Sequence, residues 1–363
     1  MPTPSTGISE VRLLATGSGP DRLWARLLVL GGADPARRLS EPASGVTVLD
    51  AAGDLVVTGS LADLAAFGRR LGPAGLALLD AARNLRRPPP PLRLGPHRWE
   101  FGRRTYLLGV VNVTPDSFSG DGVGTSPQAA LERARELVAA GADALDVGGE
   151  STRPGHRQVS VEDELRRVVP AIELMAPEFQ LPVFVDTAKA PVARAALTAG
   201  AVAVNDIWGL RRDPEMARVV AEADAAVICM HNQDGVVYGD LRGEVLAGLR
   251  HSQRVAATAG IPPEQVLVDP GFGFGKTPRQ SVELLRHLEE LRLLGRPLVV
   301  GTSRKSMVGW LLDNRPVEGR LLGTAATVAW AVFHGADVVR VHDVAAMRDV
   351  ALVADRLARA QTH

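Results

Sequence analysis

The stretch that decides the fold is residues 266–305, VLVDPGFGFGKTPRQSVELLRHLEELRLLGRPLVVGTSRK. It opens with the aliphatic run Val266 to Val268 and continues through glycine and polar residues into a pattern rich in leucine, arginine and glutamate, which is typical of a helix. A second aliphatic run, Leu298 to Val300, follows, and polar residues again come directly after it. Short aliphatic strands that alternate with helices are typical of a parallel α/β architecture.

The same alternation repeats over about 250 residues, the usual size of a (β/α)8 barrel. The aliphatic runs are Leu107 to Val111, Ala144 to Val147, Val183 to Val185, Val202 to Val204, Ala226 to Met230, Val266 to Val268, Leu298 to Val300 and Val338 to Val341. Because there are eight of them, we predict a closed α/β fold, the TIM barrel. An open doubly wound sheet is the alternative, since the spacing from Val183 to Val202 leaves room for only a short helix.

The run Arg86-Arg87-Pro88-Pro89-Pro90-Pro91 separates the predicted barrel from an earlier region, because consecutive prolines favour an extended polyproline conformation. We therefore predict a small N-terminal α/β domain of unknown role at residues 1–87, a Pro-rich linker at 88–98 and the barrel at 99–363. Within the first region the patterns predict strands at Leu23 to Leu30, Val46 to Leu49 and Leu55 to Thr58, and helices at Leu61 to Leu71 and Leu76 to Leu85.

The composition excludes several classes of protein. Lys plus Arg and Asp plus Glu both number 41, so the chain lacks the net positive charge that holds nucleic acid or an anionic membrane. A single cysteine, Cys229, excludes an intramolecular disulfide, and no Cys/His cluster has zinc-ligand spacing. Met1 to Pro20 lacks the pattern of a signal peptide, and no apolar run is long enough to span a bilayer. We expect a cytoplasmic protein.

Scarce residue types gather after the predicted strands. Only three of the 41 basic residues are lysines, and the chain has only five asparagines. All three lysines, Lys189, Lys276 and Lys305, and three of the asparagines, Asn112, Asn205 and Asn232, follow an aliphatic run. Since the active site of such a barrel lies at the carboxyl ends of its strands, this distribution predicts a functional site there.

Two groups of polar residues occupy these strand ends. Asn112, Thr152, Arg153, Arg340 and His342 follow the first, second and eighth runs, which become neighbours when the barrel closes. Guanidinium groups bind phosphate oxygens in pairs, so we expect this group to bind a phosphate or diphosphate. The amide of Asn112 suits a hydrated Mg2+ that bridges the diphosphate oxygens.

The second group contains Asp186, Asn205, Asp269 and Lys305, from the third, fourth, sixth and seventh runs. Two inward-facing carboxylates and an amide suit a flat heterocycle with an N–H/NH2 edge, because an ionised carboxylate accepts two such donors at once. The alternative is an internal ion-pair network between Lys305 and Asp269 or Asp186.

At these residues the sequence closely resembles the dihydropteroate synthase family. The resemblance covers about Tyr106 to the C-terminus. The matching blocks, in order, are GVVNVTPDSFS (109–119), DVGGESTRPG (146–155), VFVDTAKAPVA (183–193), VNDIWG (204–209), VDPGFGFGKT (268–277), GTSRKSMVG (301–309) and VVRVHDV (338–344). It implies that a pterin diphosphate and p-aminobenzoate are condensed to dihydropteroate, with Mg2+ as cofactor, in folate biosynthesis.

The resemblance also implies residue roles. Asp186, Asn205, Asp269 and Lys305 would hold the pterin and carry the catalysis, and Asn112, Thr152, Arg340 and His342 would hold the diphosphate and Mg2+. The residues implied at the p-aminobenzoate site or elsewhere at the substrate-binding mouth are Phe118, Arg153, Pro154, Gly273, Phe274, Ser303 and the stem of Lys305. A homodimer is expected from the resemblance alone.

Two other functions compete with this interpretation. A pterin-binding methyltransferase would use the same barrel but would need no diphosphate site, which the Arg340/His342 pair argues against. A non-catalytic pterin-binding subunit would be expected to have lost a charged site residue, and none is missing.

Overall fold

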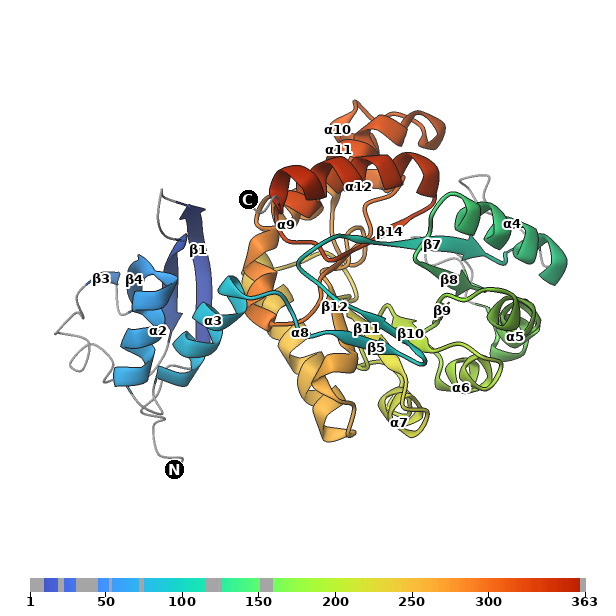
Figure 1. Ribbon diagram of the computed structural model, residues 1–363, viewed down its shortest axis with the longest axis horizontal. Helices are drawn as coiled ribbons and strands as arrows, with labels where there is room; N and C mark the ends of the chain where they lie inside the picture. Colours follow the sequence, from blue (N-terminus) through green and yellow to red (C-terminus); the bar gives the residue numbers. More distant parts are fainter. Residues whose placement is uncertain are drawn as a thin grey trace. The chain divides into compact units, whose positions relative to one another are not determined.

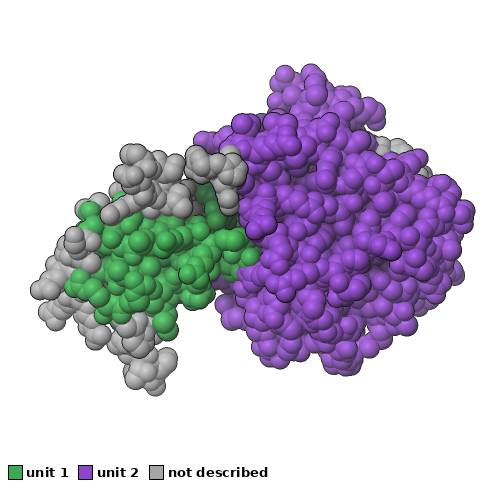
Figure 2. Space-filling view, viewed as in Figure 1, with its two compact units in different colours: residues 1–89, 289–295 green, residues 90–288, 296–363 purple. Residues whose placement is uncertain are grey.

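The computed structural model describes residues 10–18, 23–30, 45–51, 54–71, 75–114, 124, 126–150 and 159–359. The chain divides into two compact units, coloured separately in Figure 2. Unit 1 comprises Met1–Pro89 and Glu289–Gly295, and unit 2 comprises Pro90–Leu288 and Arg296–His363. Residues 289–295, which the sequence analysis counts with the barrel, therefore group with the N-terminal residues.

Unit 1 contains a four-stranded antiparallel sheet in the order β1-β2-β4-β3. Its elements are β1 (Glu10–Ser18), β2 (Leu23–Leu30), β3 (Val46–Ala51), β4 (Asp54–Ser60), α2 (Leu61–Arg70) and α3 (Leu76–Arg86). The hydroxyl of Ser60 begins α2 by accepting a hydrogen bond from the backbone N–H of Asp63 at 3.1 Å. Every predicted element of this region is present, and β1 is an additional strand that the sequence analysis did not predict.

Unit 2 is built on a parallel sheet of eight strands, in the order β12-β11-β10-β9-β8-β7-β14-β13. The strands are β7 (Tyr106–Asn112), β8 (Ala144–Gly148), β9 (Val183–Asp186), β10 (Ala203–Asp206), β11 (Ala226–Met230), β12 (Val266–Asp269), β13 (Val299–Val300) and β14 (Val338–Val341). A parallel bridge between Val268 and Leu298 joins the two ends of this order. The sheet therefore closes, which confirms the predicted (β/α)8 barrel and excludes the open doubly wound sheet.

Helices follow the strands around the barrel (Figure 1). They are α4 (Pro127–Ala139), α5 (Val161–Glu178), α6 (Ala190–Thr198), α7 (Met216–Glu222), α8 (Leu241–Thr258), α9 (Pro278–Arg286), α10 (Ser306–Leu311), α11 (Leu321–Phe333) and α12 (Val344–Ala358), with 3-10 turns η2 (Pro263–Gln265), η3 (Leu288–Leu294) and η4 (Val317–Gly319). Helix α6 has nine residues, so a short helix does fill the narrow spacing after the third run.

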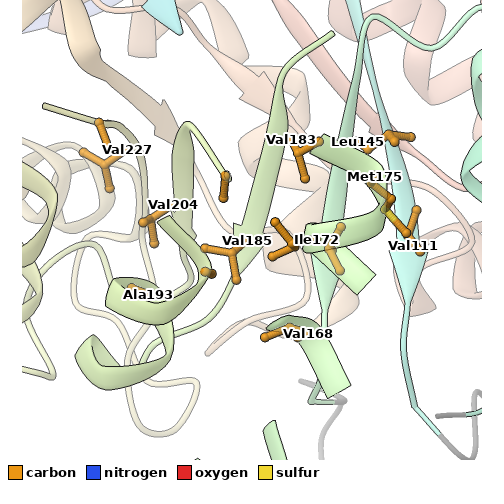
Figure 3. Packing of buried hydrophobic residues seen from close by; sticks show 14 of the residues in the cluster. Val111, Leu145, Val168, Ile172, Met175, Val183, Val185, Ala193, Val204 and Val227 are labelled. Carbon is orange, nitrogen blue, oxygen red and sulfur yellow. The ribbon is translucent and has the colours of Figure 1, made fainter. Parts of the chain in front are cut away.

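Two apolar clusters stabilise the barrel. The larger one lies between strands and helices, where Val111 and Leu145 of the sheet meet Ile172 and Met175 of α5 (Figure 3). The smaller one fills the barrel interior, with Leu108, Phe184 and other strand residues that point inward. Strands buried on both faces explain why the runs are continuously aliphatic.

A hairpin of β5 (Leu92–Leu94) and β6 (His97–Trp99) belongs to the interior cluster. Leu92 and Leu94 are fully buried, and the ring of Trp99 stacks on Tyr106, the first residue of β7, at 4.3 Å. The second half of the predicted linker is therefore part of the barrel core. Because this hairpin packs at the amino ends of the strands, the carboxyl ends are left for the chemistry.

Candidate active site

Polar residues of neighbouring strands lie at one level of the barrel. Asn112 pairs in register with Gly148, and Asp186 pairs with both Gly148 and Asn205. Residues paired in this way face the same side of a sheet, and Phe184, two residues before Asp186, belongs to the interior cluster. The side chains of Asn112, Asp186 and Asn205 therefore face the inside of the barrel at its carboxyl end.

A largely buried ion-pair network joins these strands to β14. Arg340 donates from Nε to Asp146 Oδ2 at 2.6 Å and from a terminal nitrogen to Asp186 Oδ2 at 2.7 Å. Asn205 donates from Nδ2 to the same Asp146 oxygen at 3.0 Å. One guanidinium group thus bridges two carboxylates, and one of these carboxylates also holds the Asn205 amide.

Asp146 is the site residue that the sequence analysis missed. It lies inside the run Ala144 to Val147 and is fully buried, so its sequence position is that of a strand interior and not of a strand end. A single carboxylate within a buried aliphatic strand was the available signal, because such a charge requires a partner. The internal ion-pair alternative had named Lys305, whereas in the described residues the cation paired with Asp146 and Asp186 is Arg340.

The network shifts the pKa values of its members. Burial raises the pKa of Asp186 to about 7; the charge of Arg340 opposes this shift and the charge of Asp146 adds to it. Burial alone would lower the pKa of Arg340, but the carboxylates of Asp146 and Asp186 outweigh it and raise that pKa above its usual value. Arg340 therefore stays charged, and Asp186 can hold or release a proton near neutral pH.

Lys305 and Asp269 lie together on the other side of the site. Lys305 donates from Nζ to the carbonyl of Phe272 at 2.7 Å, and Nζ lies 4.7 Å from the centre of the Phe274 ring. Burial lowers the pKa of Lys305 to about 8, against the opposing charge of Asp269. Burial raises the pKa of Asp269, while Lys305 and a hydrogen bond from the Gly271 N–H at 2.7 Å oppose that rise.

The loop after β12 is fixed by Lys276 and by glycines. Lys276 Nζ donates to the carbonyls of Phe274 at 2.9 Å and Gly271 at 3.2 Å, so a buried ammonium group holds the loop on which Lys305 rests. Gly271 has φ +73°, and a Cβ there would lie 2.0 Å from a backbone oxygen of His231. Gly273 also has a positive φ, and a Cβ there would lie 3.7 Å from Lys305, so Gly273 lies beside the Lys305 stem.

The loops after β13 and β14 are joined by side chains. Ser303 Oγ lies 3.0 Å from His342 Nδ1 and accepts a hydrogen bond from the His342 N–H at 3.2 Å. Arg304, with φ +58°, donates twice to Asp343, at 2.9 and 2.5 Å. His342 is thus held beside Ser303, while Arg340 lies in the carboxylate network. Assignment of both residues to a diphosphate site stays a prediction.

Phe118, Thr152, Arg153 and Pro154 lie outside the described residues. Glu150 and Val159, which flank residues 151–158, are described. Lys189 Nζ donates to Glu150 at 2.5 Å and to the carbonyl of Val159 at 2.8 Å, and so joins the two flanks. A further ion pair with Glu164 occupies the same ammonium group. One of the chain's three lysines, Lys189, therefore has a structural role.

Two further findings concern metal ions and membranes. Within the described ranges, no group of three or more His, Cys, Asp or Glu side chains is arranged to hold a metal ion. Among the helices of the described residues, none has the length and apolarity that a bilayer crossing requires.

Comparisons with known proteins agree with this geometry. Residues 108–342 match the family described as pterin binding enzyme. The dihydropteroate synthase of Synechocystis sp. is 45% identical over 278 residues, which cover 75% of this chain and 96% of that protein. Two structures of the Xanthomonas albilineans dihydropteroate synthase are also similar. The one with 4-aminobenzoic acid has a TM-score of 0.70 at 42% identity, covering 74% of this chain and 98% of that one. The one with 7,8-dihydropteroate has a TM-score of 0.67 at 39% identity, with the same coverage. The chain belongs to the dihydropteroate synthase family of pterin-binding enzymes.

Proposed function

We propose that the chain condenses 6-hydroxymethyl-7,8-dihydropterin diphosphate with p-aminobenzoate, giving 7,8-dihydropteroate and diphosphate in folate biosynthesis. The observation that supports this most directly is the cluster of Asp186, Asn205, Arg340 and Lys305 inside the carboxyl end of the barrel. Family membership and the ligands of the Xanthomonas albilineans enzyme support the same substrates.

The pterin ring binds through its N–H/NH2 edge to the carboxylates. Asp186 and Asp269 are acceptor groups in a largely buried place, where a ligand donor replaces the water that burial removes. Asn205 and Lys305 supply the complementary amide and ammonium groups. Since Arg340 already occupies one oxygen of Asp186, ligand binding and the Arg340 contact share that carboxylate.

The reaction breaks the bond between the pterin methylene carbon and the diphosphate oxygen. Arg340 and His342 stabilise the departing anion, and Asp186 and Asp269 stabilise the positive charge that develops on the pterin. The arylamine nitrogen then forms the new bond to the methylene carbon and loses a proton. Because the amine attacks in its neutral form, and its proton becomes acidic once the bond forms, no strong general base is assigned.

The p-aminobenzoate ring lies at the mouth of the site. We place one wall of this site at Phe274 and Lys305, because the Lys305 ammonium group lies 4.7 Å from the centre of the Phe274 ring. Ser303 contributes a hydroxyl nearby in the chain. Phe118 and Pro154 are proposed to bind the same ring on the ground of the family resemblance alone.

Mg2+ is proposed as the cofactor, beside Asn112. That residue ends β7, is partly exposed, and offers a carbonyl oxygen, a ligand type that Mg2+ accepts. Because no cage of acidic or histidine side chains exists in the described residues, diphosphate oxygens and water would supply most of the coordination. The ion, when bound, neutralises charge on the diphosphate. Titration of Mg2+ into the turnover assay tests this.

A homodimer is also proposed. Helix α11 packs beside α10 and α12 (Figure 1). All three helices carry exposed apolar side chains, together called the apolar patch. The patch contains Trp310, Leu311, Leu321, Leu322, Trp330, Phe333, Leu352, Val353 and Leu357. Apolar patches of this kind mark protein–protein interfaces. Light scattering is expected to give twice the chain mass of 38.4 kDa.

A cytoplasmic location is proposed from the single cysteine, which is buried and free.

The proposed reaction is tested by incubating the protein with the pterin diphosphate, p-aminobenzoate and Mg2+. Dihydropteroate and diphosphate are expected in equal amounts, and omission of either substrate abolishes both. Tight binding of methyltetrahydrofolate without any diphosphate release would instead support the methyltransferase. Pterin binding without turnover would support a non-catalytic subunit.

A further inference from the structure

The two carboxylate oxygens of Asp146 differ in their contacts. It is fully buried in β8, and its Oδ2 atom accepts from both Arg340 Nε and Asn205 Nδ2. Its Oδ1 atom is also buried and has no hydrogen-bond partner among the described residues. A carboxylate with one unsatisfied oxygen is unfavourable in a barrel core, so its retention calls for a reason other than stability.

We propose that Asp146 is a positioning residue of the pterin site, which holds Arg340 in place and fixes the orientation of the Asn205 amide. This inference rests on the proposed function. The arrangement that carries it is a single carboxylate oxygen shared by a cation from β14 and an amide from β10, 194 and 59 residues away along the chain.

The first consequence concerns Arg340. In the described structure its guanidinium group bridges Asp146 and Asp186. When a pterin donor occupies Asp186, the contact from the terminal nitrogen of Arg340 is released, but the contact from Nε to Asp146 remains. Arg340 therefore stays in the site with its terminal nitrogens directed to the leaving group, and Asp186 becomes available to the ligand.

The second consequence concerns Asn205. An ionised carboxylate can only accept hydrogen bonds, so the side of the amide that contacts Asp146 is the NH2 group. The oxygen of Asn205 then faces away from Asp146, on the same level as Asp186, its partner in register. Asn205 thus presents an acceptor to the ligand, and the site prefers a heterocycle edge that donates.

The test is Asp146→Asn, which keeps the shape but removes the charge and the fixed polarity. We expect the KM for the pterin diphosphate and the Kd for free pterin to rise about tenfold or more, the size of one lost charge-assisted hydrogen bond. The KM for p-aminobenzoate is expected to change less than twofold. The matched control is Asp355→Asn, another buried carboxylate, which accepts from Thr105 at 2.7 and 2.8 Å and pairs with Arg359 at 2.9 Å just before β7.

Both variants lose a buried ion pair, so both are expected to melt at lower temperature, but only Asp146→Asn is expected to lose pterin affinity. The double variant that combines Asp146→Asn with Arg340→Met tests whether Asp146 acts through Arg340. If Asp146 acts through Arg340, the two changes are strongly non-additive in pterin-diphosphate affinity. Additive effects, or a folded Asp146→Asn protein with unchanged pterin affinity, would overturn the proposal.

A measurement on the unmodified protein covers the case in which Asp146→Asn does not fold. The Nε proton of Arg340, observed by NMR, is expected to stay protected from hydrogen exchange with and without bound pterin. Loss of that protection on binding would show that Arg340 leaves Asp146. Pterin binding and exchange do not require turnover, so failure of the proposed reaction and failure of this proposal give different results.

Discussion

At the scale of single residues, the site depends on where charges are buried. Asp186, Asn205, Asp269 and Lys305 could be predicted because each follows an aliphatic run, and a strand end in a barrel is a position where function is expected. Asp146 could not be predicted in the same way. Its role depends on Arg340, which the fold brings close from 194 residues away, and its own position looks like strand interior.

Lys305→Ala is predicted to weaken both substrates together. The Lys305 ammonium group donates to the Phe272 carbonyl and lies over the Phe274 ring, so one side chain is proposed to serve both the pterin pocket and the p-aminobenzoate wall. We expect the Kd for pterin and the KM for p-aminobenzoate each to rise about tenfold, the loss of one charge-assisted contact. A lower melting temperature with both constants unchanged would show that Lys305 has only a structural role.

Asp186→Asn is predicted to alter the pH dependence of stability in the ligand-free protein. Because the pKa of Asp186 is raised to about 7, from 3.8, the folded state favours the protonated carboxyl. The protonated Asp186 carboxyl therefore stabilises the folded state. This stabilisation is fully present below pH ~4 and is lost as pH rises through 7. As pH rises from 5 to 8, we expect the free energy of unfolding of Asp186→Asn to increase relative to that of the native protein. Urea unfolding at both pH values measures this difference.

The control for this measurement is Asp234→Asn, whose side chain is 91% exposed. It is expected to show the same difference from the native protein at both pH values. A pH-independent difference for Asp186→Asn as well would contradict the raised pKa.

At the scale of elements, loops that come from different strands hold one another. The sequence indicated polar residues after the seventh and eighth runs, and the structure shows that they are joined through Ser303–His342 and Arg304–Asp343. Pairings between loops could not be predicted, because they depend on which strands become neighbours. The positive φ of Arg304 was equally inaccessible, since arginine gives no local sign of a left-handed conformation.

Arg304→Ala is predicted to loosen both loops. The lost pair of hydrogen bonds to Asp343 destabilises the protein by about 1.5–3 kcal/mol, and kcat/KM for the pterin diphosphate is expected to fall about tenfold because Ser303 and His342 are no longer fixed. The matched control is Arg135→Ala, since Arg135 forms a similar pair of bonds to Glu178 at 2.6 and 2.9 Å on helices α4 and α5. If both variants kept native kcat/KM, the Arg304–Asp343 pair would have no positioning role.

At the scale of the whole molecule, the aliphatic runs predict a parallel sheet buried on both faces, and their number, eight, favours the barrel. The runs alone also fit an open doubly wound sheet, which only the closure between β12 and β13 excludes. The membership of unit 1 was not predictable. Residues 289–295 belong to it, and Glu290 in this segment pairs with Arg12 of β1 at 2.5 Å, 278 residues away. A buried pair between such distant positions leaves no local pattern in the sequence.

A chain that begins at Leu92 is predicted to fold and to remain active, because every residue with a proposed chemical role lies beyond Gly109. The shortening removes Arg12, which pairs with Glu290, together with the rest of unit 1, to which residues 289–295 belong. Because residues 289–295 lose the rest of their unit, we expect the shortened chain to melt at a lower temperature than the full chain. Calorimetry and dihydropteroate formation check both forms. A folded but inactive chain would place part of the active site in the first 91 residues.

The central claim is that Asp186 and Asp269 stabilise the pterin cation while Arg340 and His342 bind the diphosphate. It is tested most directly by the single-turnover rate of Asp186→Asn, together with its affinity for the pterin diphosphate. Loss of a charge that acts in the transition state is expected to lower the rate by about 100-fold or more. The affinity for the pterin diphosphate is expected to fall much less, because Arg340 and His342 still bind the diphosphate. A folded Asp186→Asn protein with a near-native rate would contradict the account.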